Sequence, residues 1–141
     1  MKTYRYKVQR NGFGLFLGIA AETTRLTSVP ARGAPVSERV WLDASEVDNA
    51  FHGNRLTLNE HEVACLQFGL GKVSGDIELI ETSPYLLISI RALEIVEVGY
   101  AEAALAPAIA GWAEAEFFLT PRRCDVSRDS ATGQFAFDWD E

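Results

Sequence analysis

The run from Leu86 to Val98, followed by Gly99 and an alanine-rich stretch, constrains the fold more than any other part of the sequence. Aliphatic and β-branched side chains occupy both faces of this run. That pattern is typical of a long, largely buried strand, or of two strands with a break near Ala92 and Leu93. Gly99 suits a sharp turn because glycine adopts backbone angles that other residues avoid. The sequence therefore predicts a buried strand that turns directly into a helix.

The alanine-rich stretch predicts a helix whose small side chains allow its backbone to come close to a sheet. Leu105, Ile109 and Trp112 fall at helical spacing and form one apolar stripe, which predicts that Trp112 is part of the core. Pro107 would cost about 3 kcal/mol inside a helix but little in its first turn. We therefore expect the main helix to begin near Ala106, with one kinked helix as the alternative.

An earlier helix is expected to begin at Asn59. Asn59 can cap it, and Glu62 three residues later completes a capping box. Gly69 and Gly71 predict the end of this helix. The alternating residues 76–81 are then expected to form a strand.

Two hairpins are expected, one at each end of the chain. Residues 3–10 alternate as a strand does, and Asn11-Gly12 is a strong turn signal before a return strand over 13–22. At the C-terminus, residues 124–127 and 134–139 are expected to pair.

The segment between the first hairpin and the first helix has fewer signals. Residues 23–39 are rich in turn-forming residues and predict a long loop. Val40 to Leu42 predicts a short strand, and residues 43–49 a single helical turn. Together these elements predict a single α+β domain over residues 1–141. It has a mostly antiparallel or mixed β-sheet, two main helices packed on one face, and a C-terminal hairpin.

Charge is distributed unevenly along the chain, whose net charge is −7. Residues 1–39 carry seven basic and two acidic residues, whereas the remainder is strongly acidic. An acidic surface disfavours nonspecific nucleic-acid binding and favours basic partners, although solubility alone also explains it. No apolar stretch reaches the roughly 20 residues that a membrane span needs. We expect a cytoplasmic protein with two free cysteines, Cys65 and Cys124.

Catalytic and metal-binding signatures are sparse, so we expect no cofactor and no metal. His61 lies between two glutamates, but adjacent helical positions do not converge, and a structural or surface role is favoured. Cys65 is expected on the inward side of its helix as a small core residue. Cys124 follows two arginines, which can lower the pKa of a thiol. No partner for nucleophilic catalysis is identifiable beside it.

Two stretches resemble a known family. Residues 6–14 (Tyr-Lys-Val-Gln-Arg-Asn-Gly-Phe-Gly) resemble the strand and glycine turn that open domain IV of bacterial elongation factor G. Residues 88–91 and 97–104 resemble that domain's later strand and the start of its helix. The resemblance covers roughly residues 4–118 and implies the fold of the second domain of ribosomal protein S5. The His-containing loop of the factor is missing, Pro107 interrupts the helix, and residues 120–141 are additional, so no functional residue is carried over.

The function favoured by size, acidity and absent catalytic signals is non-enzymatic. We expect a protein-binding module that masks a basic partner, as the immunity proteins of bacterial toxins do. The alternative is a ribosome- or RNA-associated module, suggested by the family resemblance and the basic N-terminal third. A small enzyme that uses Cys124 or His61 is the third hypothesis.

A partner surface is expected around Trp41. An aromatic anchor with a charged rim has the composition of an interface hot spot, although burial of Trp41 in the core is the competing interpretation. The residues of this predicted surface come from the loop 23–39, from the candidate strand and from the acidic segment after it: Arg32, Arg39, Trp41, Asp43, Glu46 and Asp48.

Overall fold

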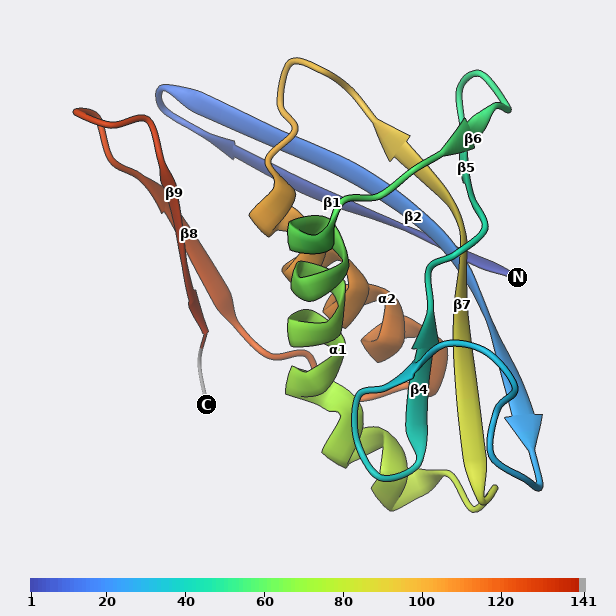
Figure 1. Ribbon diagram of the computed structural model, residues 1–141. Coiled ribbons are helices and arrows are strands. Elements are labelled where there is room, and N and C mark those ends of the chain that lie inside the picture. Colours follow the sequence, from blue (N-terminus) through green and yellow to red (C-terminus); the bar gives the residue numbers. More distant parts are fainter. Residues whose placement is uncertain (140–141) are drawn as a thin grey trace.

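The computed structural model describes residues 1–139, and it has an α+β fold as predicted (Figure 1). Two helices, α1 (Glu60–Ile80) and α2 (Leu105–Phe117), cover one face of a mixed sheet. A short 3-10 helix, η1 (Glu102–Ala104), leads directly into α2. No helix within residues 1–139 is both long enough and apolar enough to cross a membrane.

The main sheet has the strand order β1-β2-β7-β4-β3, with β5 and β6 joined to it beside β7. Its strands are β1 (Lys2–Arg10), β2 (Phe13–Leu26), β3 (Ala34–Pro35), β4 (Val40–Asp43), β5 (Val47–Asn49), β6 (Arg55–Leu56) and β7 (Tyr85–Ile95). The β1–β2 and β2–β7 pairs are antiparallel, whereas β4 and β5 run parallel to β7. A separate antiparallel hairpin consists of β8 (Cys124–Arg128) and β9 (Phe135–Trp139).

Strand β7 lies in the middle of the sheet, which explains its aliphatic sequence. Its residues Leu86, Ile88 and Ile90 are buried under the helices, and Leu87 on the opposite face is also buried. The strand ends at Ile95, before the predicted limit, and Val98 is 89% exposed. The chain then turns at Gly99, whose φ of +113° is accessible to glycine at little cost.

Helix α1 is much longer than predicted, because it continues through Gly69 and Gly71 to Ile80. The expected helix end at these glycines and the expected strand over residues 76–81 are therefore wrong. Gly69 serves helix packing, since a Cβ atom there would overlap the backbone of Ala106 in α2. The buried stripe of the helix extends through Val73 and Ile77, which holds its second half on the sheet.

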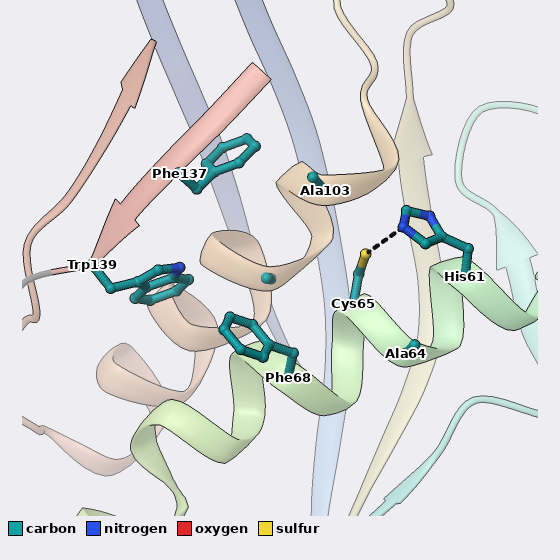
Figure 2. Close-up of a pocket in the computed structure, with 8 residues that line it drawn as sticks. His61, Ala64, Cys65, Phe68, Ala103, Phe137 and Trp139 are labelled. Atoms are coloured by element: carbon teal, nitrogen blue, oxygen red, sulfur yellow. Dashed lines mark hydrogen bonds between the residues drawn. The ribbon is translucent and has the colours of Figure 1, made fainter. Parts of the chain in front are cut away.

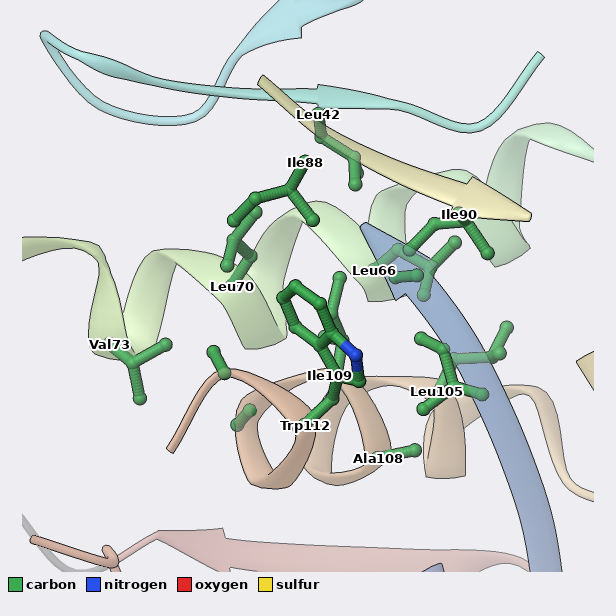
Figure 3. Packing of buried hydrophobic residues seen from close by; sticks show 14 of the residues in the cluster. Leu42, Leu66, Leu70, Val73, Ile88, Ile90, Leu105, Ala108, Ile109 and Trp112 are labelled. Carbon is green, nitrogen blue, oxygen red and sulfur yellow. The ribbon is translucent and has the colours of Figure 1, made fainter. Parts of the chain in front are cut away.

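Helix α2 begins at Leu105, so Pro107 lies in its first turn, as predicted. The helix approaches β1 closely, because a Cβ atom on Gly111 would overlap the ring of Tyr4. Trp112 is fully buried between the two layers (Figure 3) and donates its indole N–H to the backbone oxygen of Lys2 at 2.9 Å. The expected core role of Trp112 is confirmed.

Two expectations for residues 23–49 need correction. Strand β2 continues to Leu26, and β3 forms within the rest of the predicted loop, because both segments find partners in the sheet. The helical turn predicted for residues 43–49 is also wrong. Part of that segment is β5, which pairs with both β6 and β7. Tertiary pairing thus overrides weak local preferences here.

Candidate functional site

A groove opens between α1, the start of α2 and the C-terminal hairpin (Figure 2). We call it the helix–hairpin groove. Its volume is about 450 Å³, and its lining is mostly apolar. The residues that line it come from α1, η1, α2 and β9: His61, Ala64, Cys65, Phe68, Ala103, Ala106, Phe137 and Trp139. Such a cavity, with few polar groups at one end, has the make-up of a binding site for an apolar group.

Aromatic side chains form the hairpin end of the helix–hairpin groove. Phe68 of α1 meets Trp139 of β9 edge to face, with ring centroids 6.3 Å apart. The Nζ atom of Lys72 lies 5.1 Å from the centroid of the Phe68 ring and 5.9 Å from that of Trp139. Phe68 nevertheless remains 54% exposed, so its ring offers apolar surface to a ligand.

Hydrogen bonds organise the opposite end of the groove around Glu102. His61 Nδ1 lies 3.3 Å from Glu102 Oε1, and Asn59 donates a side-chain N–H to Glu102 Oε2 at 2.7 Å. Because the carboxylate accepts at both oxygens, its position relative to His61 is fixed. The arrangement places the imidazole proton on Nδ1 and leaves Nε2 free to accept.

Cys65 follows His61 by one helical turn, and its Sγ lies 3.9 Å from His61 Nε2 (Figure 2). Cys65 packs against the core, as expected of the inward side of its helix, but it is only half-buried and also lines the groove. Burial, together with the charges of Glu102 and Glu62, raises the pKa of the Cys65 thiol. At neutral pH the sulfur therefore carries its proton.

The capping box of α1 adjoins this cluster and is confirmed. Asn59 accepts from the backbone N–H of Glu62, and Glu62 accepts from that of Asn59. Glu62 also accepts a hydrogen bond from the hydroxyl of Tyr100, the residue that follows the turn at Gly99. Burial and this hydrogen bond raise the pKa of the Tyr100 hydroxyl. The cap thus ties the helix start to the segment that carries Glu102.

The predicted partner surface around Trp41 lies elsewhere, on the side of β4. Arg32 reaches Asp43 at 3.7 Å and Glu46 at 4.0 Å, so the expected proximity of opposite charges is present. Asp43 is buried and also accepts from Ser45. Trp41 is half-buried and points away from the helices, opposite its buried strand neighbours. Its indole N–H is enclosed without a hydrogen-bond partner among the described residues.

The remaining two residues of that surface do not join it. Asp48 pairs with Arg55 across β5 and β6 at 3.4 Å. Arg39 binds backbone oxygens at the C-terminal end of α1 and after it, those of Glu78, Glu81 and Ser83. Arg39 therefore stabilises a helix end, and the role of the other residues in partner binding stays a prediction.

The pKa of the Cys124 thiol is raised, although the two arginines before it led us to expect a lowered one. Burial, then the charges of Asp125 and Asp138, raise the pKa of its thiol to about 11. The neighbouring arginines do not lower it, because Arg122 turns to Asp76 and Arg123 to Asp125. Both cysteines are free thiols. Within residues 1–139, no three acidic, histidine or cysteine side chains are placed to hold a metal ion.

Glu102 is the residue of this site that sequence reasoning did not connect to His61. It lies 41 positions from His61, and only the turn at Gly99 brings it to the start of α1. A scan against models of known protein families finds no match, and neither does a search among curated proteins. The resemblance to domain IV of elongation factor G therefore stays a prediction.

Proposed function

We propose that the protein is a binding module that masks a basic partner protein, and that the helix–hairpin groove takes an apolar side chain of that partner. The observation that carries the proposal is an apolar groove that ends at carboxylates. Among the described residues, Glu62 and Glu102 have no arginine partner, and Glu102 faces His61 instead. A cation beside the inserted side chain would supply the missing charge.

The apolar groove and its carboxylates contribute differently to binding. Burial of an aromatic or large aliphatic side chain against Phe68 and Trp139 supplies affinity, since well-packed aromatic contacts dominate most interfaces. The carboxylates attract a basic surface and speed its approach, an effect that salt weakens. This division of labour suits an immunity-like inhibitor in the cytoplasm, where the partner is a basic protein such as a toxin.

The test is affinity capture from a lysate of the source cells at low and high salt, using the whole chain as bait. We expect a basic protein that is captured at low salt and lost from the Phe68→Ala and Glu102→Gln variants. Phe68→Ala should weaken binding at least about tenfold, the usual scale for an interface anchor.

Leu79→Ala provides the matched control, because Leu79 is an exposed apolar residue of α1 outside the groove. Capture that is equal for Phe68→Ala and Leu79→Ala would contradict the proposal. Recovery of ribosomes, with a steep salt dependence, would instead support the ribosome-associated alternative.

A further inference from the structure

The same groove brings together a thiol, an imidazole and a carboxylate, of which the proposed binding role uses only the carboxylate of Glu102. Cys65 Sγ contacts His61 Nε2 at 3.9 Å, and His61 Nδ1 contacts Glu102 Oε1 at 3.3 Å. The two ring nitrogens thus face a nucleophile and an orienting carboxylate. A nucleophile within reach of a base that a third group orients is the geometric signature of nucleophilic catalysis.

The carboxylate is itself held in place. Asn59 donates to the second oxygen of Glu102, and Asn59 is fixed as the N-cap of α1. His61 and Cys65 are one turn apart on the same helix, so their separation is set by the helix itself. The three groups are therefore positioned by two rigid elements, α1 and η1.

We propose that Cys65 is a nucleophile that accepts acyl groups from activated esters or thioesters, with His61 as its general base and Glu102 as the positioning residue. The acyl chain would lie in the helix–hairpin groove against Phe68 and Phe137, since the lining beyond Cys65 is apolar. This inference goes beyond the binding role and departs from the expectation that the protein is not an enzyme.

The reaction balances with water as the only co-reactant. Sγ attacks the carbonyl carbon while its proton passes to His61 Nε2. The bond from carbon to the leaving oxygen or sulfur breaks, and the leaving group takes the proton. Water then attacks the Cys65 acyl thioester and gives a proton to His61, which returns it to the departing sulfur. The products are a carboxylic acid and an alcohol or thiol, with no change of oxidation state.

Protonation of the thiol explains why the base is needed. Because burial and two nearby carboxylates raise the pKa of Cys65, little thiolate is present before substrate arrives. His61 must remove the proton during attack, as a general base does. The charged and titratable groups that face this pair are Glu62, Glu102 and Tyr100.

The test uses p-nitrophenyl acetate and p-nitrophenyl hexanoate with the whole chain, following release of p-nitrophenolate and the intact mass. We expect a burst of one p-nitrophenolate per chain followed by slower turnover, with the acyl group located on Cys65 by peptide mapping after the burst, and a faster burst with the hexanoyl ester. Cys65→Ala should abolish the adduct. Cys124→Ser, the matched control, should leave the adduct and its rate unchanged, because Cys124 lies outside the groove.

His61→Gln should slow acylation at least about 100-fold, the lower end of what general bases supply. Glu102→Gln should slow acylation by either ester, and Glu102→Asp should restore part of the rate, because the imidazole needs a carboxylate beside Nδ1 to orient it. Equal labelling of Cys65 and Cys124, or a Cys65 rate unaffected by His61→Gln, would overturn the proposal.

A second measurement needs no substitution, so it still tests the proposal if the variants fail to fold. In the unchanged protein, alkylation of Cys65 by iodoacetamide should exceed that of Cys124 at neutral pH. Equal rates would overturn the proposal. Neither experiment involves a protein partner, so its failure leaves the capture experiment unaffected.

Discussion

The two ends of helix α1 gather charged side chains from distant parts of the chain, but they use them differently. At the C-terminal end, Arg39 binds backbone oxygens, and Arg25 forms a two-point contact with Glu81. At the N-terminal end, Glu62 and Glu102 meet neutral donors and His61. Charge is cancelled at one end and accumulates at the other, beside an apolar groove.

This difference separates structural charge from charge available to a ligand. Carbonyl groups at a helix C-terminus need donors, and an arginine that supplies them has fewer N–H groups left for a ligand. Carboxylates near an N-terminus are favoured by the helix dipole, so several can collect there without a basic partner. We therefore expect substitutions at the C-terminal end to change stability, and substitutions at the N-terminal end to change binding or reactivity.

The largest effect is expected for Arg39→Ala. Loss of its three contacts with backbone oxygens should lower the free energy of unfolding by about 2–3 kcal/mol, because these groups are partly buried and the donor is charged. Urea denaturation measures this. Arg25→Ala is the control, since its contact with Glu81 is exposed and should be worth less than about 1 kcal/mol. A binding defect in Arg39→Ala without loss of stability would contradict this assignment.

A smaller effect, visible as a dependence on pH, is expected for Glu78. The Ser37 hydroxyl bond, the Arg39 backbone N–H and the Arg39 charge lower the pKa of this carboxyl, although burial opposes them. A lowered folded-state pKa means that the stabilisation is present above the ordinary value of 4.5 and is lost as pH falls through the folded value.

At pH 7 the free energy of unfolding of the Glu78→Gln variant should therefore be lower than that of the unsubstituted protein by about 1 kcal/mol or less. This difference in stability should disappear in acid. Thermal melts from pH 7 downward measure this. A stability difference that grows in acid would show that Glu78 does not stabilise the C-terminal end of α1 through its charge.

The smallest effect on stability is expected for Glu102→Gln, within about 0.5 kcal/mol of the unchanged protein. The amide still offers an oxygen to Asn59, and the site is partly exposed. Urea denaturation beside the acylation and capture assays separates the two kinds of effect. If Glu102→Gln destabilised the fold as strongly as Arg39→Ala, the distinction between the two helix ends would be lost.

Local signals in the sequence were sufficient for the features that depend on one or two neighbouring residues. The Asn11-Gly12 turn, the capping box at Asn59 and the position of Pro107 all follow from backbone chemistry that tertiary packing does not change. The predicted α+β class, with two helices on one face of a mixed sheet, follows from the arrangement of these signals.

The errors arise where packing decides. From the sequence alone Gly69 predicts a helix end, but in the fold it allows the backbones of α1 and α2 to come into contact. Residues 76–81 alternate as a strand does, yet Val73 and Ile77 are also spaced for one face of a helix. The site was missed for a similar reason, since no periodicity connects His61 with Glu102 across 41 positions.

The contact of Gly69 with Ala106 has a consequence for how the groove can change its ligand preference. Cys65 and Phe68 precede this contact on α1, and Ala103 and Ala106 lie on the facing segment, so backbone touching backbone sets the separation of these two walls. Larger or smaller side chains on the helices would not bring those walls together. Phe137 and Trp139 lie on the hairpin, outside that contact, and their replacement would reshape the cavity without changing the separation of the two helix walls. Variation in ligand preference among descendants of this chain should therefore concentrate in β9.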